Sequence, residues 1–302
     1  MSRSPRLGDL MRSRLGRSNG AVRAMPSRLK ASLAHRTARA CAGLLRRLPL
    51  SVQATVKDRF TVTQRMDYDK APIWLSIESG VERGLRSRSA RKEPETVQWI
   101  EQSLRAGDVL FDIGANIGAY SLIAVKATQG QATVYAIEPA FATFAQLTRN
   151  ILLNRCEGRI IPLPVALSDR TGLSDFCYAS LASGAASHRL AGQAEGWEGR
   201  SRPPALIQPT LSYRLDDLIA QCPLPCPTHL KLDVDGAELA VLRGAEAILQ
   251  DRRVRSILVE VDVARPQASD IAGFLEARGF RRSSTHPHGQ STLSNDIFVR
   301  AR

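Results

Sequence analysis

Short apolar runs alternate with longer amphipathic stretches from residue 94 to residue 300, and this rhythm predicts an α/β domain. Strands are expected at residues 109–113, 133–137, 160–167, 230–234 and 256–261, and helices at 94–104, 119–128, 144–152, 214–220, 237–249 and 271–275. Strands and helices that alternate in this way build a mostly parallel sheet with helices on both faces. Two last runs, 280–285 and 296–300, are expected to close the sheet as an antiparallel pair.

Several segments interrupt this rhythm. Residues 59–68 alternate like a strand and are expected to lead into the main sheet, whereas the basic residues 82–92 are expected to form a loop. Residues 172–178 and 205–211 have patterns typical of two added strands. Between them, residues 178–205 are rich in Gly, Ala, Ser and charge, which predicts a long surface loop at the carboxyl face of the sheet.

Residues 109–118, with the sequence VLFDIGANIG, join a buried strand to a helix through a glycine turn. At such a turn the backbone can lie close to a ligand, and free N–H groups at the helix N-terminus offer a polar cradle. The spacing Gly-x-x-x-Gly differs from the Gly-x-Gly-x-x-Gly of dinucleotide-binding turns. The carboxylate of Asp112 would repel a pyrophosphate, but it would suit a ligand with an ammonium and a sulfonium group, such as S-adenosylmethionine.

Polar residues follow the next two strands of the predicted sheet. Glu138 lies 20 residues after Gly118 at the end of the second strand, where a carboxylate can accept both hydroxyl protons of a ribose. Ser168 and Asp169 follow the third strand, whose end lies beside the expected ribose site. Asp169 could therefore meet the amino group of an adenine.

Two further acids, Asp233 and Asp235, end the predicted strand 230–234 in the motif LKLDVDGAE. Acids at the carboxyl end of a central strand border the ligand site of a doubly wound sheet. Either acid could act as a general base, or could orient a Lys or His that does so. Pairing with Lys231, or capping of the helix after Gly236, is the structural alternative for both.

Four blocks occur in order along the chain: DIGANIGAYSL at 112–122, AIEP at 136–139, ALSD at 166–169 and LKLDVDGAE at 230–238. With these blocks, residues 90–300 resemble the FkbM family of S-adenosylmethionine-dependent methyltransferases. The resemblance implies a Rossmann-like class I methyltransferase fold, an α/β fold with a mostly parallel seven-stranded sheet and a C-terminal antiparallel hairpin. It also implies methyl transfer to a hydroxyl oxygen of a small molecule, such as a sugar, glycan or other natural product.

The resemblance also assigns roles by position. It places Asp112, Gly114, Asn116 and Gly118 at the methionine end of the cofactor, Glu138 at the ribose, Ser168 and Asp169 on the adenine side, and Lys231, Asp233, Asp235 and Glu238 around the methyl-transfer site. Asp235 stands where most relatives are expected to have Glu, so the charge is kept and the reach is shorter. The protein then has to align two substrates and help remove one proton.

Charge sets the N-terminal region apart from this domain. Residues 1–50 hold twelve Lys or Arg and one acid, so most of the net charge of +13 lies there. We assign residues 1–55 to a basic tail, either disordered or helical near 28–48, and residues 56–302 to the methyltransferase domain, with its core at 90–302. The tail could contact an acidic membrane surface or nucleic acid, although residues 1–50 contain no Phe, Trp or Tyr on which bases could stack.

The five cysteines are scattered and odd in number, which argues against a disulfide framework and for a reducing compartment. The expected location is the cytoplasm, either free or peripheral to a membrane, because no apolar run reaches the length of a membrane span. Cys222, Cys226 and His229 lack a fourth ligand nearby, and the paired acids fix no ligand set. No metal site is therefore expected.

Two other functions agree with parts of the pattern. One is a nicotinamide-dependent oxidoreductase on a related sheet, against which the glycine spacing and Asp112 argue. The other is a protein that docks on nucleic acid or a membrane and carries a degenerate methyltransferase domain. The acceptor molecule and the oligomeric state have no signature in the sequence.

Overall fold

The computed structural model describes residues 27–186, 188–190, 203–265, 267–289 and 291–301. The chain divides into two compact units, Met1–Phe60 and Thr61–Arg302. The first unit contains two described helices, α1 (Ser27–Leu45) and α2 (Leu50–Arg59), so most of the residues expected to be helical near 28–48 are helical. Residues 1–26 of the predicted tail and residues 191–202 of the predicted surface loop lie outside the described residues.

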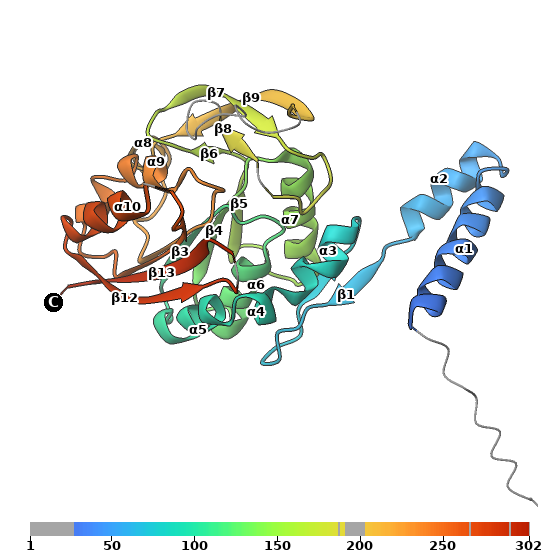
Figure 1. Ribbon diagram of the computed structural model, residues 1–302, viewed down its shortest axis with the longest axis horizontal. Helices are drawn as coiled ribbons and strands as arrows, with labels where there is room; N and C mark the ends of the chain where they lie inside the picture. Colours follow the sequence, from blue (N-terminus) through green and yellow to red (C-terminus); the bar gives the residue numbers. More distant parts are fainter. Residues whose placement is uncertain (1–26, 187, 191–202, 266, 290, 302) are drawn as a thin grey trace, which may run out of the picture. The chain divides into compact units, whose positions relative to one another are not determined.

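Seven strands form the main sheet of the second unit, in the order β12-β13-β11-β10-β3-β4-β5 (Figure 1). They are β3 (Val109–Ile113), β4 (Thr133–Ile137), β5 (Ile160–Leu163), β10 (His229–Leu232), β11 (Ser256–Asp262), β12 (Phe280–Pro287) and β13 (Leu293–Arg300). The strands from β11 to β5 are parallel, whereas β13 runs antiparallel to both β11 and β12. The predicted fold, a mostly parallel sheet with a C-terminal antiparallel hairpin, is confirmed.

Helices cover both faces of this sheet because successive side chains of a strand point to opposite sides. Leu110 and Val134 belong to a core shared with α5 (Pro94–Ser103), α6 (Ala119–Ala127) and α7 (Phe141–Leu153). Phe111 and Ile113 belong to a second core shared with α8 (Leu215–Gln221), α9 (Glu238–Arg243) and α10 (Gln267–Glu276). Figure 1 shows α8, α9 and α10 together on one side of the sheet.

The predicted strand 160–167 is wrong as a single element, because the structure divides it into β5 and β6 (Ala166–Leu167). Pro164 stands between them, and a proline has no N–H with which to continue a ladder. β6 joins a four-stranded sheet in the order β6-β9-β7-β8. Its other strands are β7 (Gly172–Tyr178), β8 (Arg189–Leu190) and β9 (Leu206–Tyr213), of which β8 lies inside the predicted surface loop.

The segment before α5 also differs from expectation. β1 (Thr63–Arg65) pairs with β2 (Trp74–Ser76) in a separate two-stranded sheet and does not lead into the main one. The predicted loop 82–92 is mostly helical, with α3 (Gly80–Gly84), a 3-10 turn (Arg86–Arg88) and α4 (Ser89–Lys92). A capping box between Ser79 and Glu82 starts α3, a signal that the sequence contained.

The helix expected at 237–249 is shorter in the structure. α9 ends at Arg243, and a 3-10 turn (Ile248–Gln250) follows. At Gly244 a side chain would overlap the carbonyl oxygen of Ser168, so the two segments are in close backbone contact. Among the described helices, none has both the length and the apolar character needed to cross a membrane.

Candidate active site

A pocket of about 300 Å³ opens at the carboxyl ends of the central strands of the main sheet. Its lining includes five of the predicted site residues, Gly114, Asn116, Glu138, Asp233 and Asp235. They follow β3, β4 and β10, three neighbouring parallel strands. The order of strands along the chain reverses between β3 and β10, and ligands of doubly wound sheets bind at such a point.

Glu138 is the buried carboxylate of this pocket. Its Oε2 accepts a hydrogen bond from the backbone N–H of Asn116 at 2.9 Å, and its Oε1 accepts one from Ala140 at 2.8 Å. Burial raises the pKa of Glu138 to about 7, although these two N–H groups oppose the shift. Each carboxylate oxygen keeps a lone pair, so the fixed carboxylate can still accept hydrogen bonds from a ligand.

The glycine turn after β3 packs tightly against the turn after β10. Gly114 has a φ of 80°, and a Cβ atom there would overlap the carbonyl oxygen of Asp233. Asn116 also has a positive φ, of 51°, and its side chain donates a hydrogen bond to the carbonyl oxygen of Ala185 at 3.0 Å. The turn therefore has a backbone conformation that few side chains would permit.

Asp112 and Lys231 lie beneath the pocket, outside its described lining. Lys231 Nζ lies 3.5 Å from Asp112 Oδ1 and 3.4 Å from Asp233 Oδ2, and Ser121 Oγ donates to Asp112 Oδ2 at 2.6 Å. Burial lowers the pKa of Lys231, but the carboxylates of Asp233 and Asp112 outweigh it and raise the pKa above its usual value. Lys231 is therefore a permanent buried cation that can hold Asp233 in place.

The turn after β10 positions Asp235. This residue has a φ of 56° and lines both the main pocket and a neighbouring pocket of about 170 Å³. Glu238 supports the turn, because its Oε1 accepts hydrogen bonds from the N–H groups of Val234 at 3.1 Å and Gly236 at 3.0 Å. Burial raises the pKa of Glu238 to about 7. Glu238 lines the smaller pocket.

Besides Asp112, three predicted cofactor residues, Gly118, Ser168 and Asp169, lie outside the described lining of the main pocket. Gly118 is where α6 begins, and a Cβ atom there would come against the side chain of Leu147. Ser168 donates its hydroxyl proton to Asp169 Oδ1 at 3.2 Å. Residues 165–167, which directly precede Ser168, line a small apolar pocket. This pocket shares Gly114 and His188 with the main pocket. Their predicted contacts with the cofactor stay predictions.

The structure adds site residues beyond those predicted from the sequence motifs. Arg86 and His188 line the main pocket, and Glu260 enters it from β11. His188 Nδ1 accepts a hydrogen bond from the N–H of Ala179 at 3.2 Å, and burial followed by the charge of Arg86 lowers its pKa to about 4. The ring is therefore neutral near pH 7 and carries its proton on Nε2. Arg86 lay within a stretch interpreted as loop.

The cysteine and histidine motif does not form a cluster. Cys222 and Cys226 are free thiols, and the described residues that could hold a metal ion together do not include them. His229 Nδ1 lies 2.7 Å from Ser256 Oγ, and its other ring nitrogen lies 3.3 Å from Asp108. These contacts use both nitrogens of the ring inside the core.

Residues 112–282 match the model of the methyltransferase FkbM domain, which is more than half of the chain. The protein belongs to the FkbM methyltransferase family. Two curated relatives of this FkbM-family protein have named activities. Hexuronic acid methyltransferase AglP of Haloferax volcanii is 32% identical over 181 residues, which cover 60% of this chain and 67% of the relative. The 31-O-demethyl-FK506 methyltransferase FkbM of Streptomyces tacrolimicus is 33% identical over 196 residues, covering 59% and 74%.

As an FkbM-family methyltransferase, the protein uses S-adenosylmethionine as its cofactor. The pocket suits this nucleoside. Glu138 offers fixed acceptor oxygens to ribose hydroxyls, and the acids Asp233 and Asp235 suit a ligand that carries positive charge. Membership of this family also excludes the nicotinamide oxidoreductase considered from the sequence.

Proposed function

We propose that this protein transfers the methyl group of S-adenosylmethionine to a hydroxyl oxygen of a sugar, glycan or other small natural product. The observation that carries the proposal is a single pocket. It contains Glu138, whose carboxylate can accept hydrogen bonds from ribose hydroxyls, together with the acids Asp233 and Asp235. The two relatives, named for a hexuronic acid and for 31-O-demethyl-FK506, support an acceptor of this class. Both named acceptors carry hydroxyl groups, and a hexuronic acid carries a carboxyl group as well.

Residues on three sides of the pocket would hold the cofactor. We assign Glu138 to the ribose, the backbone of Gly114 and Asn116 to the methionine end, and the apolar residues 165–167 to the adenine side, with Asp169 as a further candidate there. Asp112 would support this arrangement through its ion pair with Lys231. Gly118 would support it through its packing against Leu147 of α7, and Ser168 through its backbone contact with Gly244, directly after α9. When bound, S-adenosylmethionine supplies an electrophilic methyl group and its own leaving group.

The protein must then orient the acceptor and remove its hydroxyl proton. Asp233 and Asp235 are the candidate general bases, since both reach the pocket from the end of β10. Lys231 cannot take the proton because it is already protonated, so its role is to hold Asp233. Glu238 positions Asp235 through the turn. A base at hydrogen-bonding distance from a hydroxyl group commonly accelerates such a transfer by about 10² to 10⁴.

An acceptor screen tests the proposal. The full chain is incubated with methyl-labelled S-adenosylmethionine and a panel of hexuronic acids, glycans and macrolide polyols, each paired with a copy whose free hydroxyls are already methylated. Label is expected in at least one free compound and not in its blocked copy. Transfer only to amine-bearing acceptors, or equal labelling of both members of every pair, would contradict a hydroxyl acceptor.

We further propose that the protein is cytoplasmic and that its N-terminal unit can touch an acidic surface. Support comes from α1, where Arg36 and Arg39 are exposed and Leu44 is 66% exposed. A basic helix with exposed leucines binds anionic interfaces through charge and apolar burial. Sedimentation with vesicles containing phosphatidylserine, compared with binding to nucleic acid, would distinguish the two surfaces, and deletion of residues 1–50 should abolish whichever binding occurs.

A further inference from the structure

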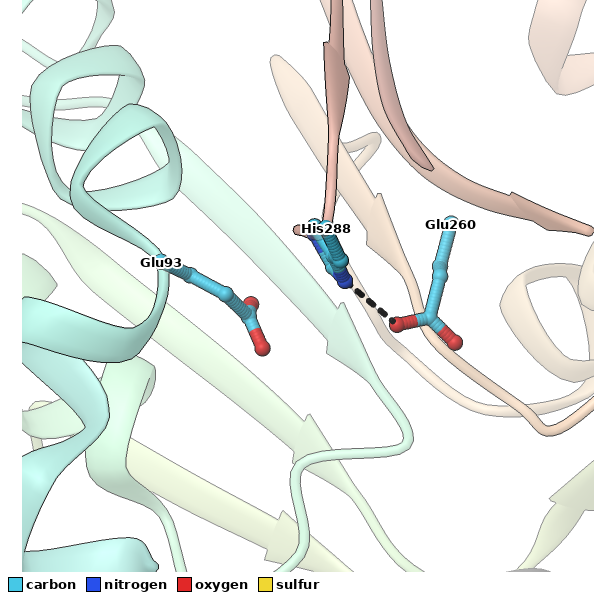
Figure 2. Close-up of side chains that lie close together, drawn as sticks. All are labelled: Glu93, Glu260 and His288. Carbon is cyan, nitrogen blue, oxygen red and sulfur yellow. Dashed lines mark ion pairs between the residues drawn. The ribbon is translucent and has the colours of Figure 1, made fainter. Parts of the chain in front are cut away.

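Three ionisable side chains meet beside the main pocket from segments far apart in the chain. Glu93 immediately precedes α5, Glu260 lies in β11, and His288 follows β12. A carboxylate oxygen of Glu93, a carboxylate oxygen of Glu260 and a ring nitrogen of His288 all lie within 4.8 Å of one another. Figure 2 shows the three side chains pointing toward a common space, with His288 between the two carboxylates.

Glu260 is the side chain of this cluster that most needs a partner. It is 9% exposed, and no described residue donates a hydrogen bond to its carboxylate. Its ion-pair partner among the described residues is His288, whose Nδ1 lies 3.7 Å from Oε1. The side chain reaches into both the main pocket and the smaller one. A buried carboxylate with this little support is unfavourable unless a cation joins it.

Glu93 is more fully buried, at 2% exposed, and the side chains of Lys92, Thr96 and Tyr120 all interact with its carboxylate. Lys92 Nζ donates to Oε1 at 2.5 Å. The other oxygen, Oε2, has a contact of 3.4 Å with Thr96 Oγ1. A carboxylate oxygen has two lone pairs, so Oε2 can accept a further ligand beside its long contact with Thr96.

The charges around the cluster favour an added cation. The carboxylates of Asp233, Glu93 and Glu238 repel the carboxylate of Glu260, whereas the ammonium of Lys231 attracts it. His288 also faces Glu95, with 3.3 Å between Nε2 and Oε1. Lys92 and Arg86 in the main pocket and Arg265 in the smaller one offset part of this negative charge, and a divalent ion would relieve the repulsion that remains.

We propose that Glu93, Glu260 and His288 form a binding site for a divalent transition-metal ion. Two carboxylate oxygens and one imidazole nitrogen suit ions such as Mn²⁺ or Fe²⁺, which accept mixed oxygen and nitrogen ligands and keep positions open for water or substrate. Metal–ligand bonds of about 2.1 Å place neighbouring ligand atoms roughly 3 Å apart, so side-chain rotations have to draw the three groups closer together. The sequence pattern gave no indication of this site.

The position of the site suggests a use that rests on the proposed function. Glu260 reaches the main pocket from β11, next to the acids at the end of β10. A metal ion at this place could bind the acceptor hydroxyl and lower its pKa, which would help Asp233 or Asp235 to remove the proton. Binding of the ion itself needs neither cofactor nor acceptor, so it can be tested alone.

The test is a titration of the full chain with Mn²⁺ alone, followed by electron paramagnetic resonance and calorimetry. Saturable binding of one ion per chain is expected. Glu260→Gln and His288→Gln should each weaken binding by about tenfold or more. The matched control is His286→Gln on the same hairpin, since His286 contacts Ser284 and lies outside the cluster; its affinity for Mn²⁺ should match that of the wild type.

A second measurement needs no substitution at the site. Spin-echo modulation of bound Mn²⁺ in the wild type should show a directly coordinated imidazole nitrogen, and the signal should persist in His286→Gln. Absence of saturable Mn²⁺ binding, absence of nitrogen coupling, or an unchanged affinity in both folded ligand variants would overturn the site. Because none of these readouts involves methyl transfer, an inactive acceptor screen would not affect the result.

Discussion

Asp112 and Lys231 are register partners on the adjacent parallel strands β3 and β10, with 3.5 Å between the Lys231 ammonium and the nearer Asp112 oxygen. Asp112 is fully buried and Lys231 is 1% exposed. The pair therefore links the strand of the glycine turn to the strand that ends in Asp233. Asp112 is not among the described residues that line the pocket, so its predicted contact with the cofactor stays a prediction.

Removal of the cation from this buried pair should destabilise the fold. We expect Lys231→Met to lower the free energy of unfolding by about 3–5 kcal/mol, because it leaves Asp112 buried without its cation. The double variant with Asp112→Asn should recover part of this loss. Lys70→Met, at a pair with Glu101 in which the lysine is 63% exposed, is the control and should cost less than about 1 kcal/mol. Urea unfolding measures these variants together with Asp112→Asn alone, and strictly additive effects of the two single substitutions would argue against a buried pair.

The close contact between the two turns predicts a second result. Gly114→Ala should destabilise the protein by several kcal/mol and weaken cofactor binding, because its Cβ atom would overlap the Asp233 carbonyl oxygen and push the turns apart. Gly130→Ala is the matched control: Gly130 also has a positive φ, of 76°, but nothing lies within 4 Å of an added Cβ atom. Its cost should be only about 1–2 kcal/mol. Equal melting temperatures of the two variants would contradict the overlap.

Glu138 should make cofactor binding depend on pH. Burial raises its pKa to about 7, and the ionised form is the better acceptor for ribose hydroxyls. Affinity for S-adenosylmethionine should therefore fall as the pH falls through 7, by about tenfold between pH 8 and pH 6 if only the ionised form binds. Calorimetry in buffers of different ionisation enthalpy should show proton release on binding at pH 6.

Glu138→Gln supplies the control for this pH effect. The amide cannot ionise, so the variant should bind the cofactor more weakly at pH 8 and lose the steep dependence between pH 8 and pH 6. Glu238 has a pKa of similar value, and Glu238→Gln should keep the pH dependence because this residue holds the turn after β10. A wild-type slope that persists in Glu138→Gln would assign the titration to another group.

The central part of the site could be predicted because strand ends have a strong signature. Parallel strands place their carboxyl ends on one edge, so acids that directly follow apolar runs must gather there, as Glu138, Asp233 and Asp235 do. The family motifs gave the same residues. The sequence could not separate residues in the pocket from residues beneath it, because Asp112 and Gly118 belong to the same turn as Gly114.

The remaining residues depend on contacts that no local pattern records. Glu260 lies within an apolar strand, and Glu93 and His288 approach it from segments that had no distinctive motif. Pro164 redirected a predicted strand into a second sheet. By contrast, the capping box from Ser79 to Glu82 is visible in the sequence. It predicts a helix start where a loop was expected. Long-range packing therefore placed Glu260, Glu93 and His288, whereas Pro164 and the capping box are local signals.

The tail should be dispensable for cofactor binding. Residues 1–60 form a unit separate from the residues that line the pocket, which lie between 85 and 293. A chain lacking residues 1–50 should therefore bind S-adenosylmethionine with unchanged affinity, measured by calorimetry. The full chain in the same buffer is the reference, and a tenfold loss would mean that the tail contributes to the methyltransferase domain.

The acids after β10 should affect turnover more than cofactor binding. If Asp233 or Asp235 removes the acceptor proton, replacing that residue by Asn should lower kcat by about a hundredfold or more, because the amide cannot accept the proton. The dissociation constant for S-adenosylmethionine should rise by a smaller factor than kcat falls, since Glu138 and the glycine turn remain intact. Asp175→Asn, at an exposed acid on β7, should retain full activity. Normal turnover in both Asp233→Asn and Asp235→Asn would move the base elsewhere, with Glu260 the next acid of the pocket to replace.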